Sequence, residues 1–523
     1  MNELYLPLAQ TKQVSSLIID YVNEEKKTTA FYQYSNSLGG FEQKIKDLDF
    51  SNEKRQLLVE ELTKQYKKNK IEKPTNIDLL LDENTYTVTT GHQLCLFGGP
   101  QYFIHKIVSV IKQCFLLKEE FPNKNFVPVF WLASEDHDFE EVNHTYLFRK
   151  VIQGNTNLKG AVGRMPMAIY EQAYQELYDL LGKDASTVKP IFGDKPQKGE
   201  TITQATTRWV HRFFKPYNLV IIDGDSKVLK QNFSSIIKQE LLNKGIYPPI
   251  KEQSQELKQL GYKTQVNPRE INLFYLDNNL RERIVVENGT YKILNTNKTF
   301  DTAKILKELE QNPQRFSPNV VLRPIYQEFT LPNLAYIGGP GELAYWLQLK
   351  KAFEHVAVPF PVLTLRDMFV FVDKKTSALL SQYNLTIIDL FLPKDQLISL
   401  YLKHNSSENI DFSEEYKKLE DLKNTFLEKV NKIDATLTQT VEAEFSKTKK
   451  NLDRIKAKTI KQLKLKEETN INKLLNSKER LLPNDKLAER KYSFIPIYVK
   501  SPNTYLPQLI TLSNPFFSAV KVF

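Results

Sequence analysis

The sequence predicts an α/β protein with a Rossmann-like, doubly wound parallel-sheet core, two connective insertions and an α-helical coiled-coil arm. Three observations predict this fold. Short apolar runs rich in β-branched residues alternate with long segments of helical periodicity. Two Gly-Gly-Pro turns each precede a predicted helix. A heptad repeat begins near Phe412, well after the last apolar run of the predicted sheet.

The composition is that of a large folded protein. The chain has 523 residues, which is too long for one ordinary core, and 41% of them are hydrophobic. The first residues lack a basic start followed by an apolar stretch, and the longest apolar runs are far shorter than a membrane span. Only Cys95 and Cys114 are present, so we expect no disulfide framework and no cysteine-rich zinc site. These features favour a soluble protein of the reducing cytoplasm.

The net charge of +10 is concentrated in one segment. Between Ser446 and Lys466 nine Lys or Arg residues accompany a single acid, Asp453, so this segment alone carries +8. The rest of the chain is therefore nearly neutral, and the overall charge says little about the catalytic body.

The predicted elements follow from periodicity. Residues 3–70 show helical spacing, and residues 102–118 show it again. Apolar runs predict strands at 86–90, 126–133, 219–223 and 360–364. The second run is uninterrupted, as is typical of a strand buried on both faces.

The predicted domains follow from these elements and from stretches rich in Gly, Asn, Lys and Pro. The core is interrupted by two connective insertions, which we expect to be surface structure rather than a second large core. The predicted order is a helical lead-in with the first half of the core (1–150), connective insertion 1 (151–205), core (206–250), connective insertion 2 (251–315), the second half of the core (316–400), an antiparallel coiled-coil arm (410–482), and a C-terminal segment that packs back on the core (483–523).

The arm is predicted from apolar residues at steps of three and four, after which a long second helix is expected to pack antiparallel on the first. Pro483 and Asn484 end the arm, and the segment from Phe494 onwards is expected to be strand and turn. The first heptad run is Phe412, Tyr416, Leu419, Lys423, Phe426, Val430, Ile433 and Leu437.

Four of the seven histidines follow the first two predicted strands: His92, His105, His137 and His144. Ligands of open parallel sheets bind beyond the carboxyl ends of the strands, where both Thr90-Gly-His-Gln93 and the segment Ser134–Asp138 are expected. The alternative is that these histidines are helix caps or hydrogen-bonded core residues.

The two glycine turns predict backbone approach to one ligand. Gly98-Gly99-Pro100 precedes the helix that carries His105 and Lys106, and Gly338-Gly339-Pro340 precedes the helix that carries Glu342. Glycines before a helix let amide groups reach an anion at its N-terminus. They serve equally in tight turns that require positive φ.

The segment Ser-Glu-Asp-His-Asp-Phe-Glu-Glu is the richest in acid–base groups. We consider Glu135, Asp136, His137 and Asp138 candidates for acid–base work or hydroxyl recognition. Metal binding is the alternative, but no HExxH or comparable spacing is present, so no metal site is expected.

Basic residues late in the core are candidates for binding phosphate or carboxylate groups. They are Arg323, Arg366, Lys374 and Lys375. The two lysines could equally form a solvated surface pair.

Several blocks together resemble the family of cysteine ligases proposed for bacillithiol biosynthesis, the BshC family. They are TGHQLCLFGGPQYFIHK, FVPVFWLASEDHDFEEVNH, QVNPREINLF, SPNVVLRPIYQE and LPNLAYIGGPGELAYW, spanning about residues 86 to 366 in consistent order. The arm and PNDKLAER extend the resemblance over nearly the whole chain.

The resemblance implies a core related to class I nucleotidyl-transferring ligases, and an arm used for homodimerisation. It also implies an ATP-dependent carbon–nitrogen ligase that joins the carboxyl group of cysteine to the amine of glucosaminyl malate, in the last step of bacillithiol synthesis. Magnesium would be the metal that accompanies the nucleotide.

Site residues follow from positions that match the family. His105 and Lys106 take the place of the His-rich signature that contacts ATP, and Lys374 and Lys375 take the place of a mobile lysine loop. The nucleotide contacts are then Gly98, Gly99, His105, Lys106, Gly338, Gly339, Glu342, Lys374 and Lys375. The residues that would line the acceptor or cysteine site are His92, Gln93, Glu135, Asp136, His137 and Asp138.

A second hypothesis is a ligase-like protein that binds nucleic acid through the arm. Lys447, Lys450, Arg454, Lys458 and Lys461 form one helical stripe that could follow phosphates. We favour a solvated outer face instead, because coiled coils place charge there by default.

Overall fold

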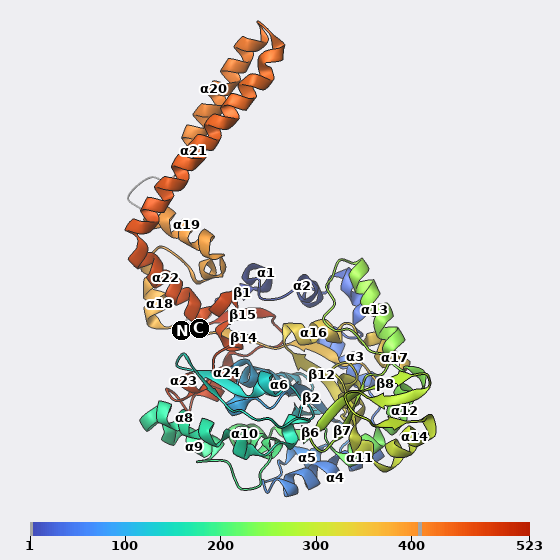
Figure 1. The fold of residues 1–523 in the computed structure, drawn as a ribbon. Coiled ribbons are helices and arrows are strands. Elements are labelled where there is room, and N and C mark those ends of the chain that lie inside the picture. The colour runs from blue at the N-terminus through green and yellow to red at the C-terminus, as the bar shows by residue number, and fades with distance from the viewer. Residues whose placement is uncertain (1–3, 406–410) are drawn as a thin grey trace. The chain divides into compact units, whose positions relative to one another are not determined.

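The computed structural model describes residues 4–405 and 411–523 (Figure 1). Residues 1–3, and residue 410 at the predicted start of the arm, lie outside this part. The described residues form two compact units. We call residues 4–369 and 489–521 the sheet unit, and residues 370–488 and 522–523 the arm unit. Nothing in the described part of the chain is a helix long and apolar enough to cross a membrane.

The centre of the sheet unit is a five-stranded parallel sheet in the order β13-β12-β2-β3-β6. Strand β2 comes first in the chain among these five and is central, and the later strands are added on both sides of it, which is the doubly wound Rossmann order. This confirms the predicted fold class. The strands are β2 (Thr85–His92), β3 (Asn125–Leu132), β6 (Val220–Asp223), β12 (Asn333–Gly338) and β13 (Val362–Leu365).

Strand β3 shows why both faces of the sheet are covered. Successive side chains of a strand point to opposite faces. Phe130 packs on Phe103 of helix α6 (Tyr102–Glu120), with ring centroids 5.1 Å apart. The next residue, Trp131, packs edge-on against Tyr326 of α15 (Arg323–Thr330) at 5.3 Å. Helices therefore lie on both faces, which explains the uninterrupted apolar run.

One face of the sheet packs against α6 and α3 (Leu38–Asp47). The buried cluster on this face joins Phe41 of α3, Val110 and Cys114 of α6, and Val88 and Ile337 of the strands. Helix α6 is buried along most of its length because it carries apolar residues on nearly every side.

Helix α4 (Asn52–Lys68) anchors the edge strand β6. The amide of Ile221 donates to the Tyr66 hydroxyl at 2.9 Å. The side chain of Gln65 accepts from the amide of Asp223 and donates to its carbonyl, at 2.9 and 3.0 Å. Gln65 thus holds the backbone of Asp223 at the carboxyl end of the strand.

The predicted lead-in is mostly helical, but it begins with a strand, β1 (Leu4–Pro7), in a small sheet of order β1-β15-β14. The partners are β14 (Met368–Val370) and β15 (Ala519–Val522). The remaining helices of this segment are α1 (Leu8–Thr11), α2 (Ser16–Val22) and α5 (Asn76–Leu79).

Two segments depart from the strand–helix alternation. The first holds α7 (Phe139–Val142), the hairpin β4 (His144–Leu147) and β5 (Lys150–Gln153), α8 (Glu171–Leu181) and α9 (Ala185–Phe192). The chain then forms α10 (Ile202–Phe214), α11 (Lys227–Asn232), α12 (Ser234–Asn243) and α13 (Tyr247–Gln259).

The second segment contains an antiparallel sheet of order β10-β9-β8-β7-β11. The sequence pattern does not predict it, because its strands are short and are joined by turns rich in Asn and Gly. It has buried residues of its own, such as Tyr275, Leu276 and Ile284. Its strands are β7 (Leu273–Asp277), β8 (Leu280–Glu287), β9 (Thr290–Ile293), β10 (Thr299–Phe300) and β11 (Phe316–Pro318), and α14 (Thr302–Gln311) lies between β10 and β11 in the chain. Helices α16 (Pro340–Trp346) and α17 (Lys350–His355) lie between β12 and β13 of the parallel sheet in the chain.

From Phe494 onwards the expected strand and turn material is present as β15 and several turns, but two stretches of this segment form helices instead. The run FIPIYV forms α23 (Ile495–Tyr498), and α24 (Tyr505–Leu512) follows. Packing decides this: Phe494 lies 5.3 Å from the ring of Phe213 and is fully buried. The buried carboxylate of Asp367 holds the end of this segment, accepting from Ser109, Ser513, the amide of Asn514 and Lys521.

The arm unit contains a hairpin of two helices, α20 (Ser413–Asn431) and α21 (Thr438–Lys466), which run side by side in Figure 1. They are antiparallel, since Phe426 packs on Phe445 at 5.7 Å and Tyr416 donates to Asp453 at 2.6 Å. This confirms the coiled-coil arm. The heptad continues past the end of α20, however, and Ile433 lies in the connection with 85% of its surface exposed.

The other helices of the arm unit are α18 (Lys374–Gln382), α19 (Lys394–Asn405) and α22 (Glu468–Leu481). Pro483 and Asn484 follow the end of α22, as predicted. The basic stripe Lys447, Lys450, Arg454, Lys458 and Lys461 is exposed on α21.

Candidate functional site

The carboxyl ends of the parallel strands place many of the predicted residues at one edge of the sheet. Strand β2 ends at His92, β6 at Asp223 and β12 at Gly338. Strand order reverses between β2 and β12, which is the switch point where doubly wound sheets bind ligands.

Three cations gather at the ends of β2 and β12, and we call Lys106, Arg323 and Arg366 the cationic group. Lys106 of α6 donates to the carbonyl of Gly91 and pairs with Glu342 at 2.8 Å. Burial lowers the pKa of Lys106, although Glu342 opposes this shift. The sequence predicts Lys106 and Glu342 as separate site residues, and the structure brings them together as an ion pair.

Both carboxylate oxygens of Glu342 accept hydrogen bonds. It accepts from the Tyr336 hydroxyl at 2.8 Å and from the amide of Gly339 at 2.8 Å, where it caps the first turn of α16. Burial raises its pKa, but the charge and hydrogen bond of Lys106 outweigh burial and lower the pKa to about 2. The carboxylate is therefore ionised at neutral pH, with 28% of its side chain exposed to solvent.

His92 is neutral at physiological pH. Burial and the nearby Lys106 charge lower its pKa to about 4. Its Nδ1 lies 3.0 Å from the carbonyl oxygen of Gln93, which can only accept, so Nδ1 carries the proton. Nε2 then carries the lone pair, which suits a hydrogen-bond acceptor or a base.

His105 is fully buried, and the structure places it against a residue that the sequence does not single out. Its Nδ1 lies 2.7 Å from Glu489, and both side chains are 0% exposed. Arg366 contacts the other oxygen of Glu489 at 2.7 Å. Burial raises the pKa of Glu489, but Arg366 and His105 together lower it to about 2. His105 is thus joined to the cationic group through Glu489.

The glycines of the first turn are packed in the core. A Cβ on Gly98 would lie 3.2 Å from the rings of Phe494 and Trp209, and one on Gly99 would lie 2.7 Å from Cys95. Both glycines have positive φ. Their conformation and packing account for glycine here without a ligand.

The glycines of the second turn differ from each other. A Cβ on Gly338 would lie 2.7 Å from Leu343, so Gly338 permits close packing of β12 and α16. Gly339 is partly exposed, and a Cβ there would lie 3.4 Å from Glu342 and 3.6 Å from Nε of Arg366. Of the two glycines in this turn, Gly339 is therefore the one whose missing side chain leaves room beside Arg366.

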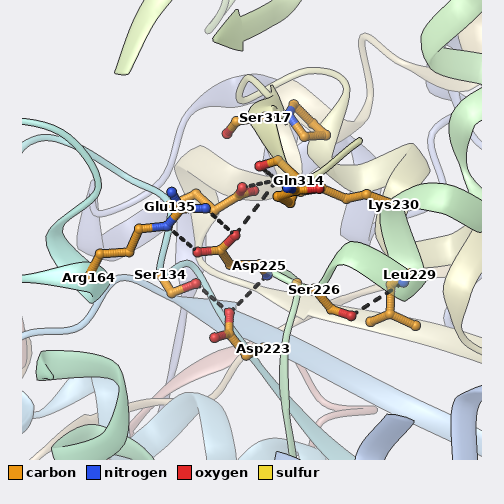
Figure 2. Close-up of polar contacts among 12 residues, drawn as sticks. Ser134, Glu135, Arg164, Asp223, Asp225, Ser226, Leu229, Lys230, Gln314 and Ser317 are labelled. Atoms are coloured by element: carbon orange, nitrogen blue, oxygen red, sulfur yellow. Dashed lines mark hydrogen bonds and ion pairs between the residues drawn. The ribbon is translucent and has the colours of Figure 1, made fainter. Parts of the chain in front are cut away.

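At the ends of β3 and β6 lies a second cluster, the carboxylate group: Glu135, Asp223 and Asp225 (Figure 2). Arg164 binds Asp225 through two hydrogen bonds of 2.7 Å. Lys230 of α11 is fully buried, pairs closely with Glu135 and lies 3.9 Å from Asp225. Ser134 donates to Asp223 in a short hydrogen bond.

Burial shapes the charges of the carboxylate group. Burial and the neighbouring Asp225 raise the pKa of Asp223 to about 6. Although burial opposes it, the bonds from Arg164 and the charge of Lys230 lower the pKa of Asp225. Burial also raises the pKa of Glu135 against the attraction of Lys230. Three carboxylates here face two cations.

Four other predicted residues, Gln93, Asp136, His137 and Asp138, make polar contacts with Glu141 and Arg281. Gln93 donates to Asp136 at 2.6 Å and to Glu141 at 2.7 Å. Arg281 of β8 lies 2.7 Å from Nδ1 of His137 and 3.8 Å from Asp136. Although burial opposes it, bonds from His137 and the charge of Arg281 lower the pKa of Asp136. Asp138 accepts from the amide of Glu141 and caps α7.

Lys374 and Lys375 begin helix α18 of the arm unit and are exposed. The side chain of Asp373 accepts from the amide of Thr376 at 2.6 Å and so caps this helix. His144 is partly buried in β4, with Nδ1 3.0 Å from Asn143.

Sequence reasoning missed Lys230, Arg281, Asp225 and Glu489. Asp223 and Asp225 carry a usable signal, since LVIIDGD places both acids directly after an apolar run. Lys230, Arg281 and Glu489 carry none, because each reaches the sheet edge from a distant segment. Across the residues that the structure describes, no group of three or more His, Cys, Asp or Glu side chains is arranged to hold a metal ion.

Comparison with known proteins agrees with the fold. Residues 1–367 match the N-terminal Rossmann-like domain of the bacillithiol biosynthesis protein BshC, and residues 369–523 match its C-terminal coiled-coil domain. A protein of Flavobacterium psychrophilum named "Putative cysteine ligase BshC" is 40% identical over 97% of this chain and 97% of its own. Proteins of the same name in Flavobacterium johnsoniae (38%, 96% of each chain) and Bacillus cereus (29%, 91% of this chain and 92% of the relative) are also similar. The chain therefore belongs to the BshC family of bacillithiol biosynthesis.

Proposed function

We propose that this protein is an ATP-dependent ligase that joins the carboxyl group of cysteine to the amine of glucosaminyl malate. The observation that carries the proposal is the presence of two oppositely charged groups at one edge of the sheet. An amide-forming ligase must hold anionic phosphate and carboxylate groups beside a substrate amine. The cationic group suits the former, and the carboxylate group suits the latter.

The reaction requires activation of the cysteine carboxylate. A carboxylate oxygen attacks a phosphorus atom of ATP, giving an acyl phosphate and ADP or an acyl adenylate and pyrophosphate. The amine of glucosaminyl malate then attacks the carbonyl carbon, phosphate or AMP leaves, and the amine proton passes to a base. Such chemistry depends mainly on positioning and on charge stabilisation.

We assign the nucleotide and acyl groups to the ends of β2 and β12. Lys106 and Arg323 supply positive charge there, and Gly339 leaves the backbone accessible. Magnesium would accompany the nucleotide. Lys374 and Lys375 are exposed and remain candidates for a further nucleotide contact.

We assign the acceptor amine to the ends of β3 and β6. An ammonium group would balance the third carboxylate of the carboxylate group, since Lys230 and Arg164 are the two cations that form ion pairs with this group among the described residues. Asp223, with a pKa of about 6, is suited to receive the proton when the amine reacts. Neutral His92 is the second candidate base.

We further propose that two copies associate through the arm, in the cytoplasm. Apolar side chains on the hairpin are exposed, among them Leu422 and Ile455. The two free thiols, Cys95 and Cys114, are buried and suit a reducing compartment.

The direct test mixes purified protein with glucosaminyl malate, cysteine and ATP and measures products by mass spectrometry. We expect the cysteine adduct, with AMP if an adenylate forms and ADP if an acyl phosphate forms. Glu135→Gln should lower the rate at least about tenfold, whereas Glu140→Gln, an exposed neighbour, should not change it. Absence of product from folded wild-type protein with every nucleotide would reject the proposed function.

A further inference from the structure

Arg323 is an arginine without a carboxylate partner. Its Nη1 donates to Gln327 at 3.0 Å and its Nη2 to the Tyr345 hydroxyl at 3.3 Å, both neutral acceptors. In the part of the chain that the structure describes, no Asp or Glu oxygen lies within 4.0 Å of the guanidinium. Partly buried arginines are normally paired, because an uncompensated charge is costly to remove from water.

Arg366 has an N–H donor, Nε–H, that contacts no acceptor among the described residues. Its Nη1 donates to the carbonyl of Asp367 and its Nη2 pairs with Glu489, both at 2.7 Å. Its Nε is buried and has no hydrogen-bond acceptor among residues 4–405 and 411–523. Buried donors almost always have an acceptor in folded proteins, so this N–H is available to an acceptor on a ligand.

Both guanidinium groups approach the ends of adjacent strands, where glycine leaves room. Nη1 of Arg323 lies 3.6 Å from where a Cβ on Gly91 would be, and Nε of Arg366 lies 3.6 Å from the corresponding point on Gly339. Gly91 is the second-last residue of β2 and Gly339 follows β12, and these strands pair directly. Lys106 reaches the same point by donating to the carbonyl of Gly91.

The charges around this point do not balance. Of the cationic group, Lys106 is paired with Glu342 and Arg366 with Glu489, whereas Arg323 has no counter-ion among the described residues. His92 adds no positive charge, because burial lowers its pKa to about 4, and burial also lowers the pKa of His105 against the attraction of Glu489. One positive charge and several directed N–H donors are therefore available to a ligand.

We propose that Arg323, together with the Nε–H of Arg366, forms an oxyanion site for a carboxylate or phosphate group of a substrate. This inference rests on the proposed function, in which the acyl donor brings a carboxylate and the nucleotide brings phosphate. A planar guanidinium can bind either oxyanion through two parallel hydrogen bonds, which a lysine cannot do.

The test compares Arg323→Gln and Arg323→Lys with Arg283→Gln. Arg283 is an exposed arginine of β8, so its variant loses the same charge away from the site. Calorimetry on the full chain measures binding of cysteine, of cysteamine, which lacks the carboxylate, and of inorganic phosphate. Steady-state assays give KM for cysteine and for ATP.

We expect Arg323→Gln to weaken binding of one oxyanion by about 10- to 100-fold, the value of a hydrogen bond to a charged group. If the oxyanion is the carboxylate, cysteine binding weakens and cysteamine binding does not. If it is a phosphate, binding of inorganic phosphate weakens and KM for ATP rises. Arg323→Lys keeps the charge and most of the stem, and it carries the test if the glutamine variant does not fold.

The inference is overturned if both variants bind cysteine and phosphate within about twofold of Arg283→Gln. The proposed function can fail separately. If wild-type protein forms no product but binds phosphate or cysteine in a manner that depends on Arg323, the oxyanion site stands and the reaction assigned to it is wrong.

Discussion

Asp223 and Glu489 are carboxylates removed from water, yet their surroundings move their pKa values in opposite directions. Burial and the adjacent Asp225 raise the pKa of Asp223 to about 6. Burial acts in the same sense on Glu489, but Arg366 and His105 outweigh it and lower the pKa to about 2. The two residues should therefore affect the pH dependence of stability with opposite signs.

Replacing Asp223 by Asn tests the raised pKa. Between pH of about 3.9 and 6 the folded state holds a proton at Asp223 that the unfolded state has released, so this stabilisation disappears as the pH rises through 6. Asparagine cannot ionise. Because only about one pH unit lies between pH 5 and the folded pKa, the free energy of unfolding of Asp223→Asn, relative to wild type, should increase by about 1.4 kcal/mol from pH 5 to pH 8.

Urea unfolding at the two pH values measures this difference. Glu140→Gln, which changes an exposed carboxylate, serves as the control. A difference between Asp223→Asn and wild type that does not depend on pH would contradict the raised pKa.

Replacing Glu489 by Gln tests the buried ion pair. The variant leaves Arg366 buried beside a neutral group, so we expect a loss of about 3–5 kcal/mol at pH 7. Because the folded pKa is lowered, the wild-type contribution is complete above a pH of about 4.3 and is lost as the pH falls toward 2. Chemical denaturation measures both effects.

The matched control for Glu489→Gln is Glu119→Gln. Glu119 is exposed on α6, the helix that carries His105, and its loss should change stability by less than about 0.5 kcal/mol. Equal stability of the two variants would show that the replacement of Glu489 does not leave the charge of Arg366 uncompensated.

Residues of the site could be predicted only where a local pattern marks them. Lys106 and Glu342 stand in the first turns of helices that follow glycine turns, and both lie at the sheet edge. Glu489 follows His105 by 384 residues, and no local pattern connects them. The same holds for Arg281, which reaches His137 from a strand of the second sheet.

At the scale of elements, the close packing of the first glycine turn predicts that a substitution at Gly98 lowers the stability of the fold. Gly98→Ala should destabilise the protein by about 1–3 kcal/mol, because the new Cβ would meet Trp209 and Phe494 and the backbone has φ of +77°. Gly341→Ala, inside α16, should be neutral or stabilising by up to about 1 kcal/mol, since nothing lies within 4 Å of its Cβ. Thermal unfolding of both variants checks the contrast, and equal melting temperatures would refute it.

Whole elements were predictable where a strand is buried on both faces or a helix is long. The predicted strand at 126–133 corresponds to β3 (Asn125–Leu132), and the predicted helix at 102–118 to α6. The segment FIPIYV looks like a strand but forms α23, because tertiary contacts of Phe494 override local β propensity. The second sheet was missed because its short strands lack a sustained apolar alternation.

At the scale of the whole molecule, the two units should differ in local stability. Helix α20 has no buried residue and α21 has only Leu463, whereas nearly all of β2 is buried. In protein dilute enough for two copies to separate, amide hydrogens of α20 and α21 should therefore exchange at least about tenfold faster than those of β2. Hydrogen exchange with mass spectrometry, run on the full chain, measures this, and α14 serves as an exposed helix of the sheet unit for comparison.

Slow exchange in α20 and α21 would mean that another surface covers them. A second copy of the chain would be the first candidate. Dilution would then restore fast exchange, and protection that persists at every concentration would contradict both the expected exposure and the association of two copies.

The sheet unit is discontinuous in the chain, and this has a consequence for its synthesis. Its last 33 residues, including Glu489 and Lys521, follow the arm unit. About 120 residues separate Phe369 from Glu489, which at 5–20 residues per second amounts to a delay of roughly 6–24 s on the ribosome. Throughout that interval Arg366 lacks its partner Glu489, and Asp367 lacks its partner Lys521. The nascent protein therefore cannot complete these buried ion pairs, or the proposed substrate site beside them, until translation is nearly finished, so we expect the growing chain to require chaperones.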